Sequence, residues 1–204
     1  MEDLAKLLKF LHETEKFKST FRKYPLSTGR KESSAEHSWR LSLMAFLVAE
    51  QLDLKIDIKK ATEIAIVHDI AEAYCGDFDS LKIFRGTLDK SVKEKAEKDA
   101  IMRITTHLPK RLGHKILSLW EEYEDAKTLE AKYIKALDKI ETTIQYIETD
   151  HSMWEGTDHV AGSYADPKVE EFPELRPFLK ELKKELRKEY KKEKVPWKKE
   201  YDTN

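Results

Sequence analysis

The stretch AIVHDIAEAYCGD, at residues 65–77, places ionisable side chains in the most apolar part of the chain. Ile, Val and Ala dominate it, and among them stand one histidine and three acidic residues, His68, Asp69, Glu72 and Asp77. Burying a carboxylate without a partner costs several kcal/mol, so such a group either neutralises or takes a partner. The stretch therefore requires something that stabilises charge at this place.

Helical spacing allows these polar side chains to share one face. We expect a helix over residues 58–75, in which residues three and four apart are neighbours. Glu72 follows His68 by four residues and Asp69 by three, and the turn after the helix returns Asp77 to the same side. Adjacent residues on a helix diverge by about 100°, yet a His and an Asp can reach one ion against that face. A divalent metal ion would satisfy the buried charge.

Two other predicted helices offer further ligands for such an ion. The helix expected at 34–53 carries His37 in its first turn. The helix expected at 128–150 contains AKYIKALDKIETT, in which Asp138 lies at the edge of a core-facing stripe. Two imidazoles and two carboxylates form a mixed nitrogen and oxygen set, which suits Mn, Co, Fe, Ni, Zn or Mg.

Spacing alone leaves simpler interpretations open. His68 and Asp69 could form a neutral hydrogen-bonded pair, His37 could cap its helix or face solvent, and Asp138 could be an exposed helical acid. Each of these is common in proteins without metal, because surface acids and histidines are frequent. The residues by themselves therefore suggest a metal site without requiring one.

Composition favours a soluble cytoplasmic protein. The net charge is −1, with 38 basic and 39 acidic residues interspersed, so no basic stripe points to nucleic acid. No apolar run approaches the ~18 residues of a membrane span, and the N-terminus lacks signal-peptide features. Cys75 is the single cysteine, which excludes an intrachain disulfide. Few Asn and Gln beside abundant Lys and Glu suit a thermophile.

Apolar residues at helical spacing predict an all-α fold. Gly and Pro number six each, and β-branched runs are short. Besides the helices already given, we expect helices at 2–17, 88–107, 110–126 and 173–193. A capping box, Ser33 with Glu36, begins the second helix.

The same pattern predicts one domain with an extension. The core, residues 1–150, would carry the metal site. Residues 151–204 would form a long loop, at 151–172, then a helix and an arm, packed on or extending from the same domain. Loops are also expected at 76–87 and in the C-terminal arm VPWKKEYDTN, which we place outside the core.

The order of these motifs resembles a known family. His37 in SSAEHSWR, His68 and Asp69 in VHDIAE and Asp138 in KALDKIE follow the H…HD…D order of the HD-domain metal phosphohydrolases. HDIAEAYCGD and LWEEYEDAKTLEAKYIKALDKIE resemble the branch of 5′-deoxynucleotidases that act on nucleoside 5′-monophosphates. The likeness runs from about residue 5 to 150.

The resemblance implies a site and an activity. It implies an all-α HD-domain fold with irregularly packed helices, in which the two histidines, Asp69 and Asp138 bind one divalent metal. Mn²⁺, Co²⁺ or Mg²⁺ would serve, and Zn²⁺, Fe²⁺ or Ni²⁺ could occupy the site. It also implies that Glu72 and Asp77 are catalytic, with interchangeable acid and base roles, and that the protein is a homodimer.

Substrate contacts are expected from the segment FRKYPLSTGRK. The family's usual Arg-Trp before Pro-Leu is replaced here, so either Lys23 and Tyr24 take those positions or Arg22 supplies the cation. Arg30 and Lys31 could also hold phosphate oxygens, with a solvated loop as the equal alternative. This departure puts strict preference for deoxyribose in doubt.

Two other functions compete with this one. The substrate could be a cyclic or polyphosphorylated nucleotide, although no Lys/Arg cluster adjoins HDIAE in the sequence. The chain could instead be a non-catalytic, metal-stabilised dimer that binds nucleotides, a reading disfavoured by the presence of Glu72 and Asp77.

Overall fold

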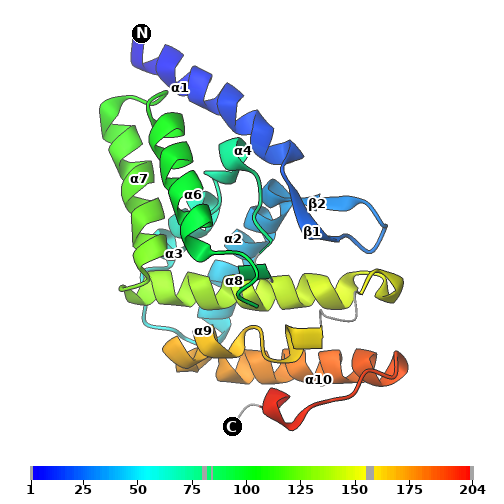
Figure 1. The fold of residues 1–204 in the computed structure, drawn as a ribbon. Coiled ribbons are helices and arrows are strands. Elements are labelled where there is room, and N and C mark those ends of the chain that lie inside the picture. The colour runs from blue at the N-terminus through cyan, green and yellow to red at the C-terminus, as the bar shows by residue number, and fades with distance from the viewer. Residues whose placement is uncertain (1, 80–81, 84, 155–158, 203–204) are drawn as a thin grey trace.

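The computed structural model describes residues 2–79, 82–83, 85–154 and 159–202, and helices dominate it (Figure 1). The prediction of an all-α fold is confirmed, with one short hairpin added. The α-helices are α1 (Glu2–Glu13), α2 (Ser34–Gln51), α3 (Ile58–Val67), α4 (Glu72–Cys75), α6 (Lys90–Thr105), α7 (Lys110–Asp125), α8 (Leu129–Glu148), α9 (Asp166–Glu171) and α10 (Arg176–Lys192). Short 3₁₀ turns are η1 (Thr14–Ser19), η2 (His151–Met153), η3 (His159–Gly162), η4 (Pro173–Leu175) and η5 (Lys199–Tyr201).

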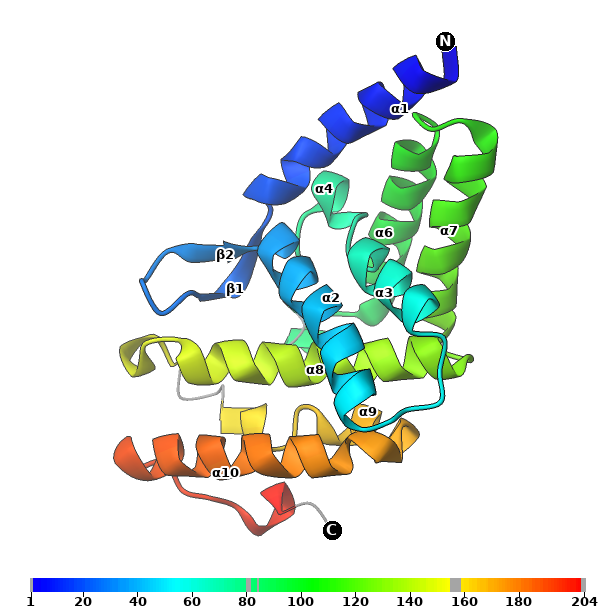
Figure 2. The same cartoon turned by 180° about the vertical axis from the view of Figure 1, so that it is seen from behind.

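Helix α8 is the element on which the others pack. It contacts α2, α3 and α7 as well as α9 and α10, and the latter two lie below it in both ribbon views (Figures 1 and 2). Its apolar residues are buried around most of its circumference, including Tyr133, Ile134, Leu137 and Ile140. A helix that is apolar on most sides must be covered on most sides. Polar side chains on α8 are therefore placed in the interior.

The single helix predicted over 58–75 is wrong, because the backbone turns at its centre. Helix α3 ends at Val67, and α4 begins only at Glu72. Between them the amide of Ile70 bonds the carbonyl of Val67, and the amide of Glu72 bonds that of Asp69. These bonds span three residues and tighten the chain relative to an α-helix. The apolar pattern continued through this segment, so the sequence did not reveal the turn.

A β-hairpin that the sequence did not predict precedes α2. Strand β1 (Phe21–Pro25) pairs antiparallel with β2 (Lys31–Ser33), and Gly29 turns the connection with φ of 80°. Ser33 ends the hairpin and begins α2: its hydroxyl accepts from the amide of Glu36, whose carboxylate accepts from the amide of Ser33. The predicted capping box is confirmed. The hairpin thus has a fixed direction relative to the first turn of α2.

The C-terminal arm packs on the domain, which is one of the two arrangements predicted for it, but the prediction that it lies outside the core is wrong. The side chain of Tyr201, in η5, is only 1% exposed. Its carbonyl accepts from Lys183 Nζ on α10 at 2.8 Å, and the same ammonium binds the carboxylate of Asp166 at 2.6 Å. A Cβ at Gly162 would overlap the Tyr201 ring, so the two segments are in close contact.

Residues 151–172 are more ordered than the predicted loop. Helix α9 and turns η2 and η3 occupy much of this range, while residues 155–158 lie outside the described residues. The predicted loop at 76–87 likewise includes positions 80–81 and 84, which are not described.

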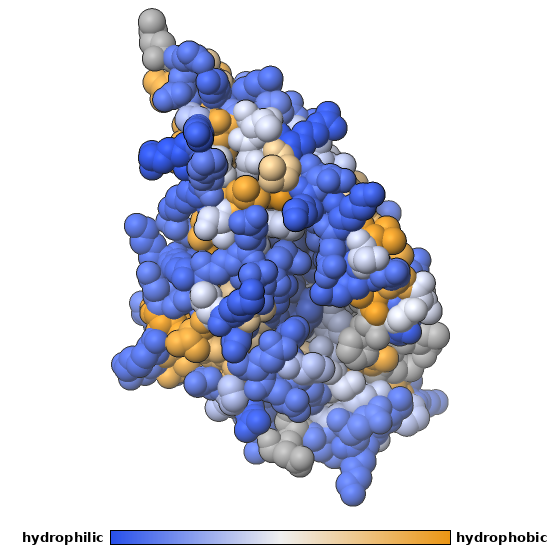
Figure 3. Space-filling view, turned by 60° about the vertical axis from the view of Figure 1, so that its left-hand side comes forward, coloured by the Kyte–Doolittle hydropathy of each residue, from blue (hydrophilic) through white to orange (hydrophobic). Residues whose placement is uncertain are grey.

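The outer surface is strongly hydrophilic on the face shown in Figure 3, where apolar patches stand apart from one another. Within the described residues, no helix is both long enough and apolar enough to cross a membrane.

The extension after residue 150 shares the main core. Val169, Phe172 and Leu175 are buried in one cluster with Leu137 of α8 and Leu41 of α2. We infer that this extension folds together with the helices that precede it, because removal of its apolar side chains would open that cluster to water.

Leu175→Ala should destabilise the whole protein by about 2–5 kcal/mol, since Leu175 is 0% exposed and its truncation leaves a cavity. Chemical denaturation monitored by circular dichroism would measure this. The control Leu129→Ala changes a side chain that is 57% exposed and should shift the free energy of unfolding by about 0.5 kcal/mol or less. A separate early transition in Leu175→Ala would show instead that the extension unfolds alone.

Candidate active site

Three elements bring the four predicted metal ligands together. His37 comes from the first turn of α2, His68 and Asp69 from the turn after α3, and Asp138 from the middle of α8. All four are buried. Ligand atoms of the first three lie within 4.8 Å of one another, and His37 Nε2 is 3.2 Å from Asp138 Oδ1.

The two histidine rings are oriented so that their Nε2 atoms face the carboxylates. His37 Nδ1 donates to the Glu141 carboxylate, and His68 Nδ1 donates to the carbonyl of Ala65 at 2.9 Å. Both Nε2 atoms are buried without a hydrogen-bond partner among the described residues. His68 Nε2 nevertheless lies 2.9 Å from Asp69 Oδ2.

This donor set fits a divalent cation. With each Nδ1 carrying the ring proton, each Nε2 presents a lone pair, and it does so beside carboxylate oxygens that also carry lone pairs. Such groups repel one another unless a cation lies between them or a proton is taken up. A metal ion accepts both donor types, and hydrogen bonds at the far ring nitrogens are the usual orienting contacts of ligating histidines.

Neighbouring charges shift the pKa values of Asp69, Asp138 and His37. Burial would raise the pKa of Asp69, but His68 and His37 lower it below its ordinary value. The pKa of Asp138 is also lowered: burial opposes this, and Lys139 and His37 outweigh burial. Burial lowers the pKa of His37, but Glu141 and Asp138 raise it to about 10. A metal ion would therefore replace a proton on His37.

Arg40 holds Glu141, the residue that orients His37, and the sequence alone did not identify either as part of the site. Arg40 Nε donates to Glu141 Oε1 at 2.7 Å, and Arg40 also donates to Gln145 and Glu148. Glu141 is fully buried. Its position three residues after Asp138 places it on the same face of α8, which is the one sequence signal that could have identified it.

Glu72 and Asp77 adjoin the metal-ligand group. Ser34 Oγ donates to Glu72 Oε2 at 2.7 Å, and Gly76, with φ of 77°, turns the chain so that Asp77 lines the same cavity. Burial, then Asp69 and Asp77, raise the pKa of Glu72 well above its ordinary value. Burial also raises the pKa of Asp77. Two carboxyls of altered basicity beside one candidate metal site are suited to proton transfer.

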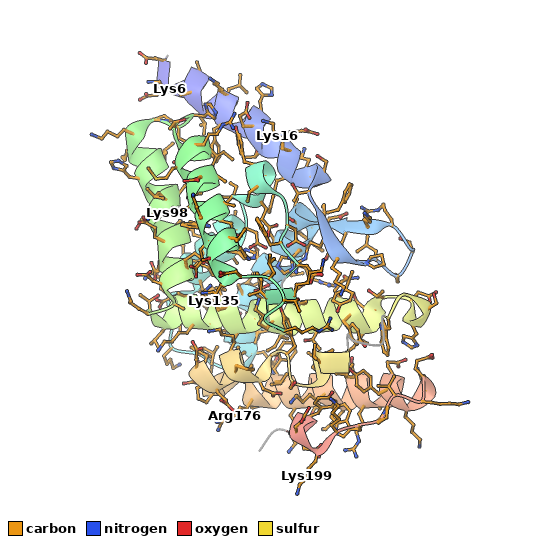
Figure 4. The ribbon with its side chains drawn as sticks, viewed as in Figure 1. Lys6, Lys16, Lys98, Lys135, Arg176 and Lys199 are labelled. Atoms are coloured by element: carbon orange, nitrogen blue, oxygen red, sulfur yellow. The ribbon has the colours of Figure 1, made fainter. Side chains whose placement is uncertain are left out.

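These groups open onto a cavity of about 520 Å³, a size typical of small-molecule sites. Besides Asp69, Glu72, Asp77 and Asp138, basic side chains line its walls: Arg22, Lys93, Lys135 and Lys139. Figure 4 labels Lys135 where α8 passes below α6. The sequence shows no basic cluster beside HDIAE, but the fold supplies one from β1, α6 and α8.

The predicted substrate-binding residues lie in different places. Arg22 lines the cavity, 3.5 Å from Asp69 Oδ2 and 3.3 Å from Glu32 Oε2. Lys23 and Tyr24 line a small cleft beside it, and the Tyr24 ring packs on Tyr146.

The fold does not bring Arg30 to the cavity. Arg30 is exposed on the hairpin connection and binds Glu36 at 2.6 Å. Its guanidinium thus supports the start of α2, and Lys31 beside it is exposed as well.

The chain is similar in sequence to a 5′-deoxynucleotidase and in structure to a predicted metal-dependent phosphohydrolase. The model of the HD domain family matches residues 14–176. The human 5′-deoxynucleotidase HDDC2 is 30% identical over 146 residues, which cover 69% of this chain and 68% of the human protein. A crystal structure of a predicted metal-dependent phosphohydrolase from Magnetospirillum magnetotacticum superposes with a TM-score of 0.66 at 29% identity, covering 84% of this chain and 95% of that one.

The chain therefore belongs to the HD domain family, in the group of 5′-deoxynucleotidases that such relatives represent. The family resemblance seen in the sequence is confirmed. The zebrafish 5′-deoxynucleotidase HDDC2, 37% identical over 114 residues, aligns over 56% of this chain. The alignment spans 54% of that relative's own length.

Glu141→Gln should weaken metal binding about 10- to 100-fold, because the amide no longer fixes the His37 ring as a carboxylate does. Titration of the metal-free protein with Mn²⁺, followed by calorimetry, would measure the affinity. Asp69→Ala removes a ligand and should abolish stoichiometric binding in the same assay. Unchanged affinity in both variants would contradict the assignment of this metal site.

Proposed function

We propose that the protein removes phosphate from (deoxy)nucleoside 5′-monophosphates with one divalent metal ion held by His37, His68, Asp69 and Asp138. It is a metal-dependent phosphohydrolase by family, and the reaction is the hydrolysis of a phosphomonoester. One observation carries the proposal: two oriented, buried Nε2 atoms face two carboxylates at the wall of a cavity lined with basic groups.

The bound metal would supply Lewis acidity, which offsets charge developing on phosphorus and lowers the pKa of water from ~15.7 towards ~7. Glu72 and Asp77 divide the proton transfers between them. One takes a proton from the attacking water, and the other gives a proton to the departing 5′-oxygen. Ser34 holds Glu72 in place for this task.

Arg22 binds the substrate phosphate. Its guanidinium is held by Glu32 and donates to Thr142 Oγ1 at 3.2 Å, so it is oriented before substrate arrives. Burial would lower its pKa, but Asp77 and Glu141 outweigh burial and keep it charged. Of the two arrangements that the sequence allowed, the one with Arg22 as the phosphate-binding cation is supported by its place in the cavity. Lys23 and Tyr24 then border the sugar side.

The metal in use is Mn²⁺, Co²⁺ or Mg²⁺. The candidate ligands offer two nitrogens and carboxylate oxygens without a thiolate, so the set does not select for soft metals. Zn²⁺, Fe²⁺ and Ni²⁺ also fit this donor chemistry.

Phosphate release from a panel of 5′-monophosphates, each in ribose and deoxyribose form, tests the function with each metal in turn. Cyclic nucleotides and nucleoside triphosphates belong in the panel, because lysines line the cavity. Turnover on monophosphates is the expected result. Turnover on cyclic or polyphosphorylated nucleotides alone would overturn the proposal, and no turnover on any compound would favour a binding module.

Glu72→Ala should retain the metal and lower kcat about 100- to 10,000-fold, since it removes a proton-transfer group. Steady-state kinetics together with metal analysis would separate these two effects. The matched control Glu121→Ala changes an exposed acid of α7 and should leave both unchanged. A near-normal rate in Glu72→Ala would show that Glu72 transfers no proton.

The family resemblance implied a homodimer, and we propose the outer face of α2 as the contact between its subunits. Four apolar side chains of that face stand at helical spacing and are exposed: Trp39 66%, Leu43 36%, Phe46 38% and Leu47 51%. Ile66 of α3, 54% exposed, lies on the helix beside α2 (Figure 2). A contiguous apolar face of this kind marks an interaction surface.

Leu47→Glu should convert the dimer to a monomer, because it would bury a charge within that face. Light scattering coupled to size-exclusion chromatography would measure the mass. Leu8→Glu, on α1, is the control and should leave the dimer intact. A monomeric parent protein, or a dimer unaffected by Leu47→Glu, would show that this face is not the contact.

A further inference from the structure

Lys139 occupies a place in the cavity that the reaction as described does not use. It follows Asp138 on α8, and its ammonium is 2.8 Å from Asp138 Oδ2. Its side chain is 26% exposed and lines the cavity beside Thr142, the residue that also receives a hydrogen bond from Arg22. A positive charge is thus held next to the candidate metal ligands, on the side open to a substrate.

Tyr164 lies close to this ammonium. Lys139 Nζ is 5.4 Å from the centre of the Tyr164 ring, and the Tyr164 side chain interacts with it electrostatically. Tyr164 is buried and lines the same cavity. It belongs to the segment between η3 and α9, which is far from α8 in sequence.

The C-terminal arm fixes the segment that carries Tyr164. The Tyr201 ring contacts the backbone at Gly162, two residues before Tyr164. Lys183 ties Asp166, two residues after it, to the carbonyl of Tyr201. The segment is therefore held on both sides of Tyr164, and this limits the positions that the Lys139 ammonium can take.

A positive charge at this position would stabilise a bound phosphate group. A phosphate monoester carries about two negative charges near neutral pH, and the cavity wall already carries the carboxylates of Asp69 and Asp138. Cationic donors at fixed positions offset that repulsion and bind phosphate oxygens with charge-assisted hydrogen bonds. Arg22 reaches the cavity from β1 and bonds Thr142 of α8, and Lys139 lines the same cavity three residues before Thr142.

We propose that Lys139 binds a phosphate oxygen of the substrate and that Tyr164 is the positioning residue that aims its ammonium. This inference rests on the proposed function. It gives the segment after residue 150 a part in substrate binding, since that segment supplies one wall of the phosphate site.

Lys139→Met should raise KM for the best 5′-monophosphate about tenfold, the loss of one charge-assisted hydrogen bond. The dissociation constant of inorganic phosphate, measured by calorimetry on the Mn²⁺-loaded protein, should rise by the same factor. Metal content should stay at that of the parent. Lys127→Met changes an exposed lysine and serves as the control, with no change in KM or phosphate binding.

Tyr164→Phe keeps the ring and removes the hydroxyl, so it should raise KM about threefold with little change in kcat. In the double variant Tyr164→Phe should add nothing to Lys139→Met, because a positioning residue acts only through the group that it positions. Additive effects would show that Tyr164 does not act through Lys139.

Turnover tests the proposed function, and phosphate affinity tests the role of Lys139. Absence of turnover in the parent protein overturns the proposed function, while phosphate calorimetry still tests Lys139. Unchanged phosphate affinity in Lys139→Met overturns the inference. Loss of metal in that variant also overturns it, since Lys139 would then serve Asp138 alone.

Discussion

The structure depends on the juxtaposition of two imidazole Nε2 atoms with two buried carboxylates. Nothing in the described part of the chain gives those nitrogens a hydrogen bond, while Glu141 and a backbone carbonyl hold the opposite sides of the rings. Buried polar groups without partners are costly unless a ligand completes them. The arrangement suits a cation between these groups or a proton on His37, and the packing of α2, α3 and α8 holds the groups in place.

The grouping of the candidate ligands could be predicted because local spacing and their order along the chain both point to it. His68 and Asp69 interrupt an apolar run, and a charge within a run of that kind requires compensation. The capping box at Ser33 fixed the start of α2 and so placed His37 in its first turn. Asp138 lies at the edge of a core-facing stripe, but it was predicted as a ligand only through the H…HD…D order of the family resemblance. These signals lie within a few residues of the groups they identify.

What the sequence could not predict depends on contacts between distant segments. After Val67 the backbone amides bond carbonyls three residues earlier instead of four, which ends the α-helix. The apolar pattern of the sequence is compatible with either kind of bond. The hairpin before α2 and the burial of Tyr201 arise from tertiary packing. The relation between Lys139 and Tyr164 likewise joins residues that no local pattern connects.

Two groups of elements supply the candidate site. The candidate metal ligands come from α2, α8 and the turn after α3, whose packing leaves them little freedom. Other residues that line the cavity come from β1, α6 and the segment after η3. Arg22 on β1 lies 3.5 Å from Asp69 Oδ2, and Lys139 lies 2.8 Å from Asp138 Oδ2. Substitutions at these two basic positions should therefore change both the charge that the cavity presents and the surroundings of the candidate metal ligands.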